Sequence, residues 1–157
     1  MMAAGEIRRT HPGSQGPVEE RERDISRICE DSVRRLAARL EGAEVGCLFR
    51  FGDVLRHVAH SGRLYLIYEV PSEQGGVAWR AAHHGELQLV EDVKSDPDYL
   101  AADESVRSEI AAPVPGPAGV VAVLDVEFPG RVFDQGAVAA VREEADRLGG
   151  ELGPYVS

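Results

Sequence analysis

Cysteine is scarce in this sequence, since Cys29 and Cys47 are the only two among 157 residues. Two thiols without a regular spacing cannot form the disulfide framework of a small secreted domain. The chain also lacks any run of 18 apolar residues, and the two arginines near its start are not followed by the apolar core of a signal peptide. We therefore expect a soluble cytoplasmic protein with no membrane partner.

Positive charge is also in short supply. Lysine and arginine contribute 17 residues against 27 aspartates and glutamates, which gives a net charge of −10 and an isoelectric point near 4.9. Such a surface repels the phosphates of nucleic acids, so we expect no nucleic acid partner. Two common catalytic motifs are missing as well, because Gly75-Gly76 lacks the Lys-Ser/Thr of a phosphate-binding loop and no G-x-S-x-G occurs.

The remaining composition is that of one globular domain. Hydrophobic residues make up 43% of the chain, and its length suffices for a single core. Residues 1–22 combine Gly, Pro, Ser and charges without apolar periodicity and are predicted to form a flexible arm. The domain is expected over residues 23–153, with a short tail over 154–157.

Apolar periodicity predicts the order of the elements. Residues at helical spacing follow Asp24, and again Asp134, each a suitable N-cap. Between these helices, alternating runs separated by Gly-containing turns predict antiparallel hairpins and one small helix. The expected segments are the strands Val45–Phe51, Val54–His60, Leu64–Val70, Leu87–Val90, Glu109–Val114 and Gly119–Phe128 and the helix Val77–His84. This order predicts an α+β fold, an antiparallel sheet with the N- and C-terminal helices on one face and a small-helix and loop pocket on the other.

The last predicted strand has two different faces. Asp125 and Glu127 share one face with Val121 and Val123. The opposite face is wholly apolar and is expected to meet the helices; it carries Val120, Ala122, Leu124, Val126 and Phe128. The acidic face is therefore predicted to form the floor of a small-molecule pocket.

Several strings of residues resemble one family. GVAWRAAHHGELQLVEDV, DPDYL, VRSEIAAPV and GVVAVLDVEF together resemble the GAF domain, and within it the free methionine-(R)-sulfoxide reductases, over roughly residues 24–152. The resemblance implies a GAF-like fold. It also implies that Glu109, Asp125 and Glu127 hold a small amine or amino acid, chiefly through its ammonium group.

The same resemblance places the three reductase cysteines at Tyr68, Ala78 and Ala102, the last beside Asp103. Sulfoxide reduction needs one thiolate to attack and a second thiol to resolve the product. The resemblance therefore implies a stand-alone sensor or regulator that needs no cofactor and is inactive as a reductase. The predicted ligand-binding residues are Tyr68, Ala78, Trp79, Ala102, Asp103, Glu109, Asp125 and Glu127.

Other interpretations stay open. The acids could form a solvated patch without a ligand, or the domain could be an interaction module with a collapsed cavity. An enzyme of non-thiol chemistry could use Asp103, Glu109 or Asp125 as acid or base, with Tyr68 as a helper. Trp79 either lines the pocket or anchors its helix. Some GAF domains bind haem through a histidine, so the resemblance also leaves haem ligation by His83 or His84 as an alternative.

Metal binding and assembly complete these expectations. His57 and His60 lie three apart on a predicted strand, so they should point to opposite faces and make a poor chelate. The carboxylates lack the His or Cys companions of a transition-metal site, and no metal is expected. The apolar seam of the last helix predicts packing on the first helix or on a second subunit, so we expect a homodimer through these two helices.

Overall fold

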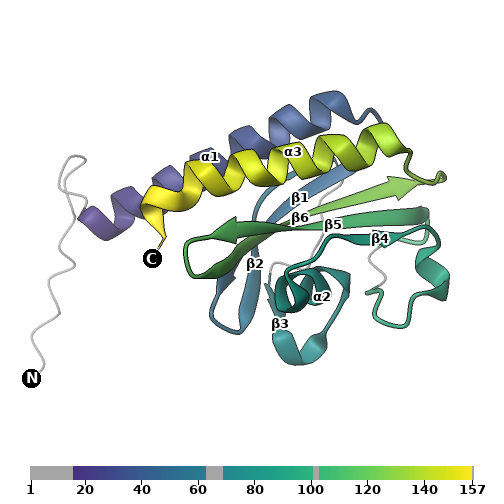
Figure 1. The fold of residues 1–157 in the computed structure, drawn as a ribbon, viewed down its shortest axis with the longest axis horizontal. Coiled ribbons are helices and arrows are strands. Elements are labelled where there is room, and N and C mark those ends of the chain that lie inside the picture. The colour runs from purple at the N-terminus through teal and green to yellow at the C-terminus, as the bar shows by residue number, and fades with distance from the viewer. Residues whose placement is uncertain (1–15, 63–68, 101–102, 157) are drawn as a thin grey trace, which may run out of the picture.

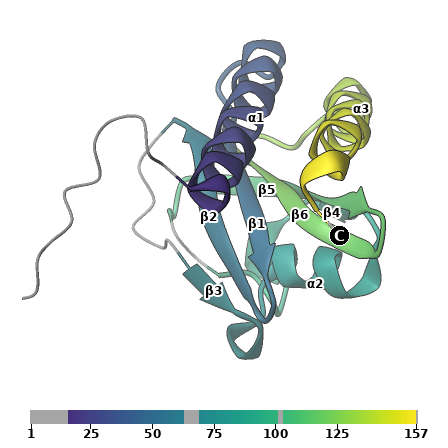
Figure 2. The same cartoon turned by 90° about the vertical axis from the view of Figure 1, so that its left-hand side faces the viewer.

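A computed structural model describes residues 16–62, 69–100 and 103–156 of the chain. Helices α1 (Pro17–Arg39) and α3 (Gln135–Leu152) lie side by side on one face of a sheet (Figure 1). Helix α2 (Val77–His84) lies on the opposite face (Figure 2). Among the described residues, none of the helices combines the length and the apolarity that crossing a membrane would need.

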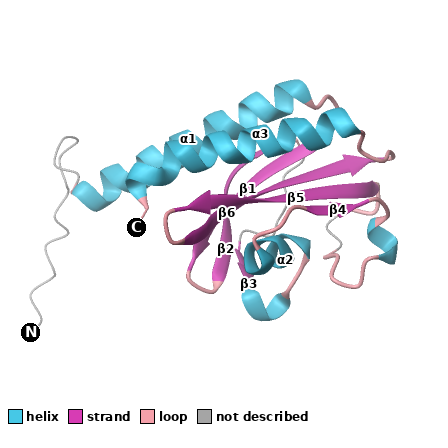
Figure 3. Cartoon of the chain, in the orientation of Figure 1, coloured by secondary structure: helices cyan, strands magenta, loops and turns pink. Residues whose placement is uncertain are grey.

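The sheet has six strands in the order β3-β2-β1-β6-β5-β4, and every neighbouring pair is antiparallel (Figure 3). This arrangement confirms the predicted α+β class, with both terminal helices on one face. The strands are β1 Glu44–Phe51, β2 Val54–Ser61, β3 Glu69–Pro71, β4 Gln88–Val90, β5 Val106–Gly116 and β6 Gly119–Pro129. Short 3₁₀ turns occupy Ser72–Gln74, Val93–Ser95 and Gly153–Tyr155.

Helix α1 begins earlier than its apolar pattern predicts. It starts at Pro17 rather than near Asp24, so residues 17–22 of the predicted arm are helical. Proline suits the first helical position because its missing N–H would have no partner there, and Glu19 and Glu20 oppose the positive end of the helix dipole. The buried apolar residues of α1 do begin at Ile25, next to Asp24, as predicted.

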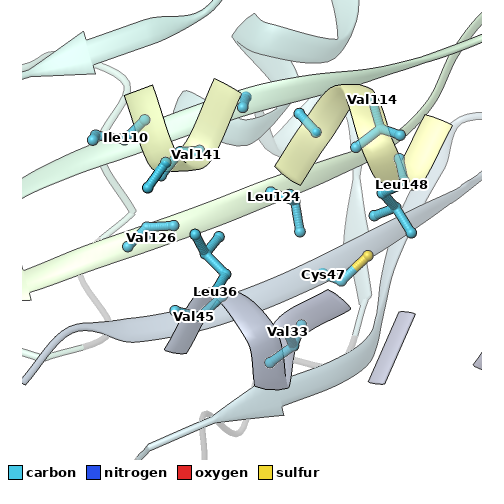
Figure 4. Packing of buried hydrophobic residues seen from close by; sticks show 14 of the residues in the cluster. Val33, Leu36, Val45, Cys47, Ile110, Val114, Leu124, Val126, Val141 and Leu148 are labelled. Atoms are coloured by element: carbon cyan, nitrogen blue, oxygen red, sulfur yellow. The ribbon is translucent and has the colours of Figure 1, made fainter. Parts of the chain in front are cut away.

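Two apolar cores lie on the two faces of the sheet. The larger core packs α1 and α3 against the sheet (Figure 4) and includes Val33, Leu36, Val45, Cys47, Leu124, Val126, Val141 and Leu148. The smaller core lies under α2 and includes Leu48, Leu55, Val77, Trp79, Val93 and Val123. Alternation along each strand assigns its side chains to the two cores, as a pleated strand requires. Two long helices cover one face of the sheet, whereas the described helix on the other face, α2, has only eight residues.

A β-bulge between β1 and β2 changes where two histidines point. Leu48 pairs with His57 while Cys47 pairs with Ala59, which leaves one extra residue in β2. His60 pairs with Gly46, so both histidines share the face of Gly46 and Leu48. The prediction of opposite faces is wrong, because the extra residue of a bulge resets the alternation of the strand.

A second register shift, near the β5–β6 turn, corrects the predicted faces of β6. Val114 pairs with Ala122, but Pro115 pairs with Val120. As a result Val121 packs against the larger core, and Val120 packs against the smaller one. The predicted faces of Val120 and Val121 are therefore wrong, because the register shift exchanges them. From Ala122 onward the predicted alternation holds, and Ala122, Leu124, Val126 and Phe128 meet the helices as expected.

Candidate functional site

Three carboxylates gather on the α2 face of the sheet. Glu109 on β5 pairs directly with Glu127 on β6, and Asp125 lies two residues before Glu127 on the same strand face. One oxygen from each of the three lies within 4.8 Å of the others. We call Glu109, Asp125 and Glu127 the acidic trio. Like charges directly across a sheet repel, so this arrangement costs free energy unless something offsets it.

A fourth acid extends the trio across the sheet. Glu44, on β1, pairs directly with Glu127 and is only 8% exposed. Glu44 was not among the residues predicted for the site, although strand alternation places it with Gly46 and Leu48, opposite the buried Val45. The row of acids therefore spans three neighbouring strands.

A cavity of about 70 Å³ lies between the acidic trio and α2. Its described lining comprises Glu44, Gly46, Leu48, His57, Val70, Gly75, Gly76, Val77, Ala78, Leu100 and the acidic trio. Gly76 has a φ of 106°, and a Cβ atom there would lie 2.9 Å from Leu100. This glycine therefore lets Leu100 close the wall. His57 was not foreseen at the cavity, because only the bulge fixes its direction.

The N-terminus of α2 forms another part of the cavity wall. Its N-cap is Gly76, which offers no side-chain cap, and Gly75, Val77 and Ala78 also line the cavity. The N–H groups in the first turn of a helix have no acceptor within it and carry a partial positive charge. The cavity therefore combines an acidic floor with a wall suited to an anionic group.

Burial and nearby negative charge raise the pKa values of the two glutamates of the acidic trio. Burial, and then the charge of Asp125, raise the pKa of Glu127 to about 9. The pKa of Glu109 lies well above its usual range for the same two reasons, and a proton shared with Asp125 adds to the effect. Without such a proton, Glu109 Oε1 and Asp125 Oδ1 have no hydrogen-bond partner among the described residues. The site thus has buried acceptors that a ligand could satisfy.

Tyr99 and Asp103 lie on the loop beside the trio. The pKa of the Tyr99 phenol is raised, first by burial and then by the negative charges of Glu127 and Glu109. Its hydroxyl is buried and has no hydrogen-bond partner among the residues the structure describes. Asp103 accepts a hydrogen bond of 2.9 Å from the Ser105 amide, and its charge also acts on Glu127.

The other predicted residues differ in their placement. Ala78 lines the cavity. Trp79 is 1% exposed, donates a 2.7 Å hydrogen bond to the Val70 carbonyl and stacks on His83, so it anchors α2. His83 and His84 are exposed at the end of α2. Tyr68 and Ala102 lie outside the described residues.

Both cysteines lie on the opposite side of the sheet from the cavity. Cys29 on α1 and Cys47 on β1 are fully buried in the larger core, on the helix side of the sheet. A hydrogen bond with Cys29, followed by burial, raises the pKa of the Cys47 thiol well above its usual value. Since the chain has two cysteines, no thiol faces the acidic trio.

Comparisons with known proteins agree on a fold. The sequence model of a family described as GAF domain matches residues 24–152. No curated protein matches the chain. Its structure is similar to a type II free methionine-R-sulfoxide reductase from Thermoplasma acidophilum, with 20% identity, a TM-score of 0.77 and coverage of 86% of this chain and 96% of the other.

Two further solved structures are similar. The free methionine-R-sulfoxide reductase from Neisseria meningitidis, in complex with its substrate, has 22% identity and a TM-score of 0.72, with 85% of this chain and 84% of the other covered. The GAF domain from an Acinetobacter phosphoenolpyruvate-protein phosphotransferase has 16% identity and a TM-score of 0.69, with coverage of 88% and 94%. Because these identities are low, the likeness shows the fold alone.

Proposed function

This chain belongs to the GAF domain family, and on that premise we propose that it binds a small amine-bearing or amino-acid-like ligand. The ligand occupies the cavity between the acidic trio and α2. Binding serves a sensing or regulatory role without thiol chemistry. Solved enzymes of similar fold act on free methionine-R-sulfoxide, itself an amino acid derivative, which supports this ligand class.

The observation that carries the proposal is the pair of unsatisfied carboxylate oxygens at the cavity floor. Glu109 is 3% exposed, and its Oε1 atom, like Asp125 Oδ1, has no hydrogen-bond partner among the described residues. A buried carboxylate without a partner is costly. An ammonium group carries one positive charge and three donors, so it offsets both the charge and the missing hydrogen bonds.

The N-terminus of α2, in the cavity wall, favours a ligand that also has a carboxylate. The N-terminus of α2 has no side-chain cap, its first residues Val77 and Ala78 line the cavity, and the N–H groups of a first helical turn have no acceptor within the helix. Helix N-termini bind anionic groups through these N–H groups and the helix dipole. A free amino acid carries an ammonium and a carboxylate on one carbon. Its ammonium suits the acidic trio, and its carboxylate suits the N-terminus of α2.

The location of the thiols supports binding without reduction. Cys29 and Cys47 are separated from the cavity by the sheet, and Ala78 at the cavity wall has no reactive group. Reduction of a sulfoxide needs a thiolate in contact with the substrate sulfur. The two free thiols also suit the reducing cytoplasm in which we propose that the protein acts.

We further propose a homodimer through the outer faces of α1 and α3. Val18 on α1 is 67% exposed, and exposed ion pairs such as Arg34–Asp31 and Arg147–Glu151 alternate in sign along the two helices. Alternating charges suit a self-complementary contact. Light scattering after size-exclusion chromatography should give the mass of a dimer, and a monomer at every concentration would contradict this assembly.

Thermal shift and calorimetric titration test the ligand class. Propylamine, alanine, methionine and methionine sulfoxide should raise the melting temperature, because a ligand that binds only the native state stabilises it. N-acetylated alanine and propionate, which lack the ammonium, should not. Asp125→Asn should abolish the response, whereas Glu30→Gln, which removes a carboxylate from the exposed face of α1, should retain it. The proposal would be refuted if no amine raised the melting temperature, or if Asp125→Asn responded as strongly as the wild type.

A further inference from the structure

We infer that the acidic trio also forms a site for a hard divalent cation of the size of calcium. All three groups offer carboxylate oxygens, which are the ligands that hard cations prefer over nitrogen or sulfur donors. This inference does not depend on amine binding, although both ligands would use the same oxygens.

The arrangement of the carboxylates favours calcium over magnesium. One oxygen from each carboxylate lies within 4.8 Å of the others, so a single cation can be placed among all three. Calcium–oxygen distances are about 2.3–2.6 Å, whereas magnesium requires about 2.0–2.1 Å in a near-octahedral arrangement. Calcium also accepts irregular shells of about 6–8 oxygens, so it tolerates three carboxylates that come from only two neighbouring strands.

Buried acceptors distinguish this trio from an ordinary cluster of surface acids. Glu109 is 3% exposed, lines the cavity and has one oxygen with no hydrogen-bond partner among the described residues. Asp125 contributes a second such oxygen from the neighbouring strand. A cation placed between them satisfies both oxygens at once.

The surroundings can complete a coordination shell. The cavity of about 70 Å³ has room for roughly two water molecules at about 30 Å³ each, and calcium, which takes 6–8 oxygens in all, can bind a carboxylate through one or both of its oxygens. The Tyr99 hydroxyl is buried, has no partner among the described residues, and lies close enough for the charges of the trio to act on its pKa. Glu44 and Asp103 add negative charge around Glu127 and so favour a cation over an anion.

Calorimetric titration of the full chain tests the inference. Protein treated with EDTA and exchanged into metal-free buffer is titrated with calcium chloride and, separately, with magnesium chloride. We expect saturable 1:1 calcium binding and at least tenfold weaker magnesium binding. Glu109→Gln and Asp125→Asn should each weaken calcium binding at least tenfold, whereas Glu30→Gln on α1 should leave it unchanged.

The melting temperature in EDTA separates a lost site from a lost fold. Removing one member of a repelling group relieves repulsion, so Glu109→Gln and Asp125→Asn should melt at or above the wild-type temperature while calcium no longer raises it. No saturable calcium heat in the wild type, or undiminished binding in Asp125→Asn, overturns the inference. Equal affinity for magnesium overturns the assignment to a large cation.

A competition experiment keeps this inference distinct from the proposed function. Calcium binding without any response to propylamine would overturn the amine proposal alone, and the reverse result would overturn the cation site alone. If both bind, saturating propylamine must weaken calcium binding, because the two share carboxylate oxygens. Independent, additive binding would show that the cation lies elsewhere.

Discussion

Replacing Glu127 by glutamine should stabilise the protein, and by more at pH 8 than at pH 5. Burial, followed by the charges of Asp125 and Glu44, raises the pKa of Glu127 to about 9 in the folded state. In the unfolded chain a glutamate titrates at about 4.3. Between these values the folded protein keeps a proton that the unfolded chain has released, so the free energy of unfolding falls as pH rises. Glutamine removes this loss.

The magnitude follows from linkage. One group of this kind lowers the free energy of unfolding by at most about 1.4 kcal/mol per pH unit, which sets a ceiling of about 4 kcal/mol between pH 5 and pH 8. Glu127 is 8% exposed, so solvent screening is weak, but protons shared within the trio reduce the effect of any single residue. We expect the advantage of Glu127→Gln to grow by about 2 kcal/mol over this range.

Urea denaturation of the metal-free protein at pH 5, 6, 7 and 8 measures this difference. The wild type, Glu127→Gln and the control Glu30→Gln are compared at each pH, and only the difference between variant and wild type is interpreted. The other titrating groups then largely cancel. The reasoning would be refuted by a difference that stays constant or shrinks as pH rises, or by an equal trend in Glu30→Gln.

Three further predictions concern the frame that holds the site. Gly149→Ala should destabilise α3, since its Cβ would lie 2.6 Å from a carbonyl oxygen of β5, whereas the adjacent Gly150→Ala, with open space, should stabilise by about 0.5–1 kcal/mol in urea. Arg80→Lys should cost about 1–2 kcal/mol by chemical denaturation, because lysine cannot make both contacts of 2.8 and 3.0 Å with Asp96. Asp134→Ala should cost about 1 kcal/mol in thermal melts by removing the α3 cap, and serine there should restore most of it.

Local signals predicted those elements whose ends carry strong backbone preferences. Helix α2 has the predicted bounds, because Gly76 and Gly85 adopt positive φ at its two ends. The cap of α3 at Asp134 was predicted for a similar reason. The start of α1 was not, since Pro17 and the acids after it are helical signals without an apolar stripe. Apolar periodicity cannot reveal a helix end whose residues are all exposed.

Local sequence patterns likewise predicted only part of the site. Alternation along β6 placed Asp125 and Glu127 on one face, and a single strand is enough to decide that. The contribution of Glu44 and Glu109 depends on which strands are neighbours, and that pairing joins residues far apart in the chain. The direction of the His57 side chain depends on a β-bulge that no local sequence pattern predicts.

The sequence by itself determined the fold class, the acidic face of β6 and the scarcity of thiols, because each depends on composition or on the period of one element. The family resemblance grouped Glu109 with Asp125 and Glu127, but only the tertiary structure showed that their oxygens gather within 4.8 Å and that Glu109 and Asp125 each bury an oxygen without a partner among the described residues. The tertiary structure also decided that Cys47 lies on the far side of the sheet from them. Strand order and register set these distances, and both result from the packing of the whole chain rather than from any one segment.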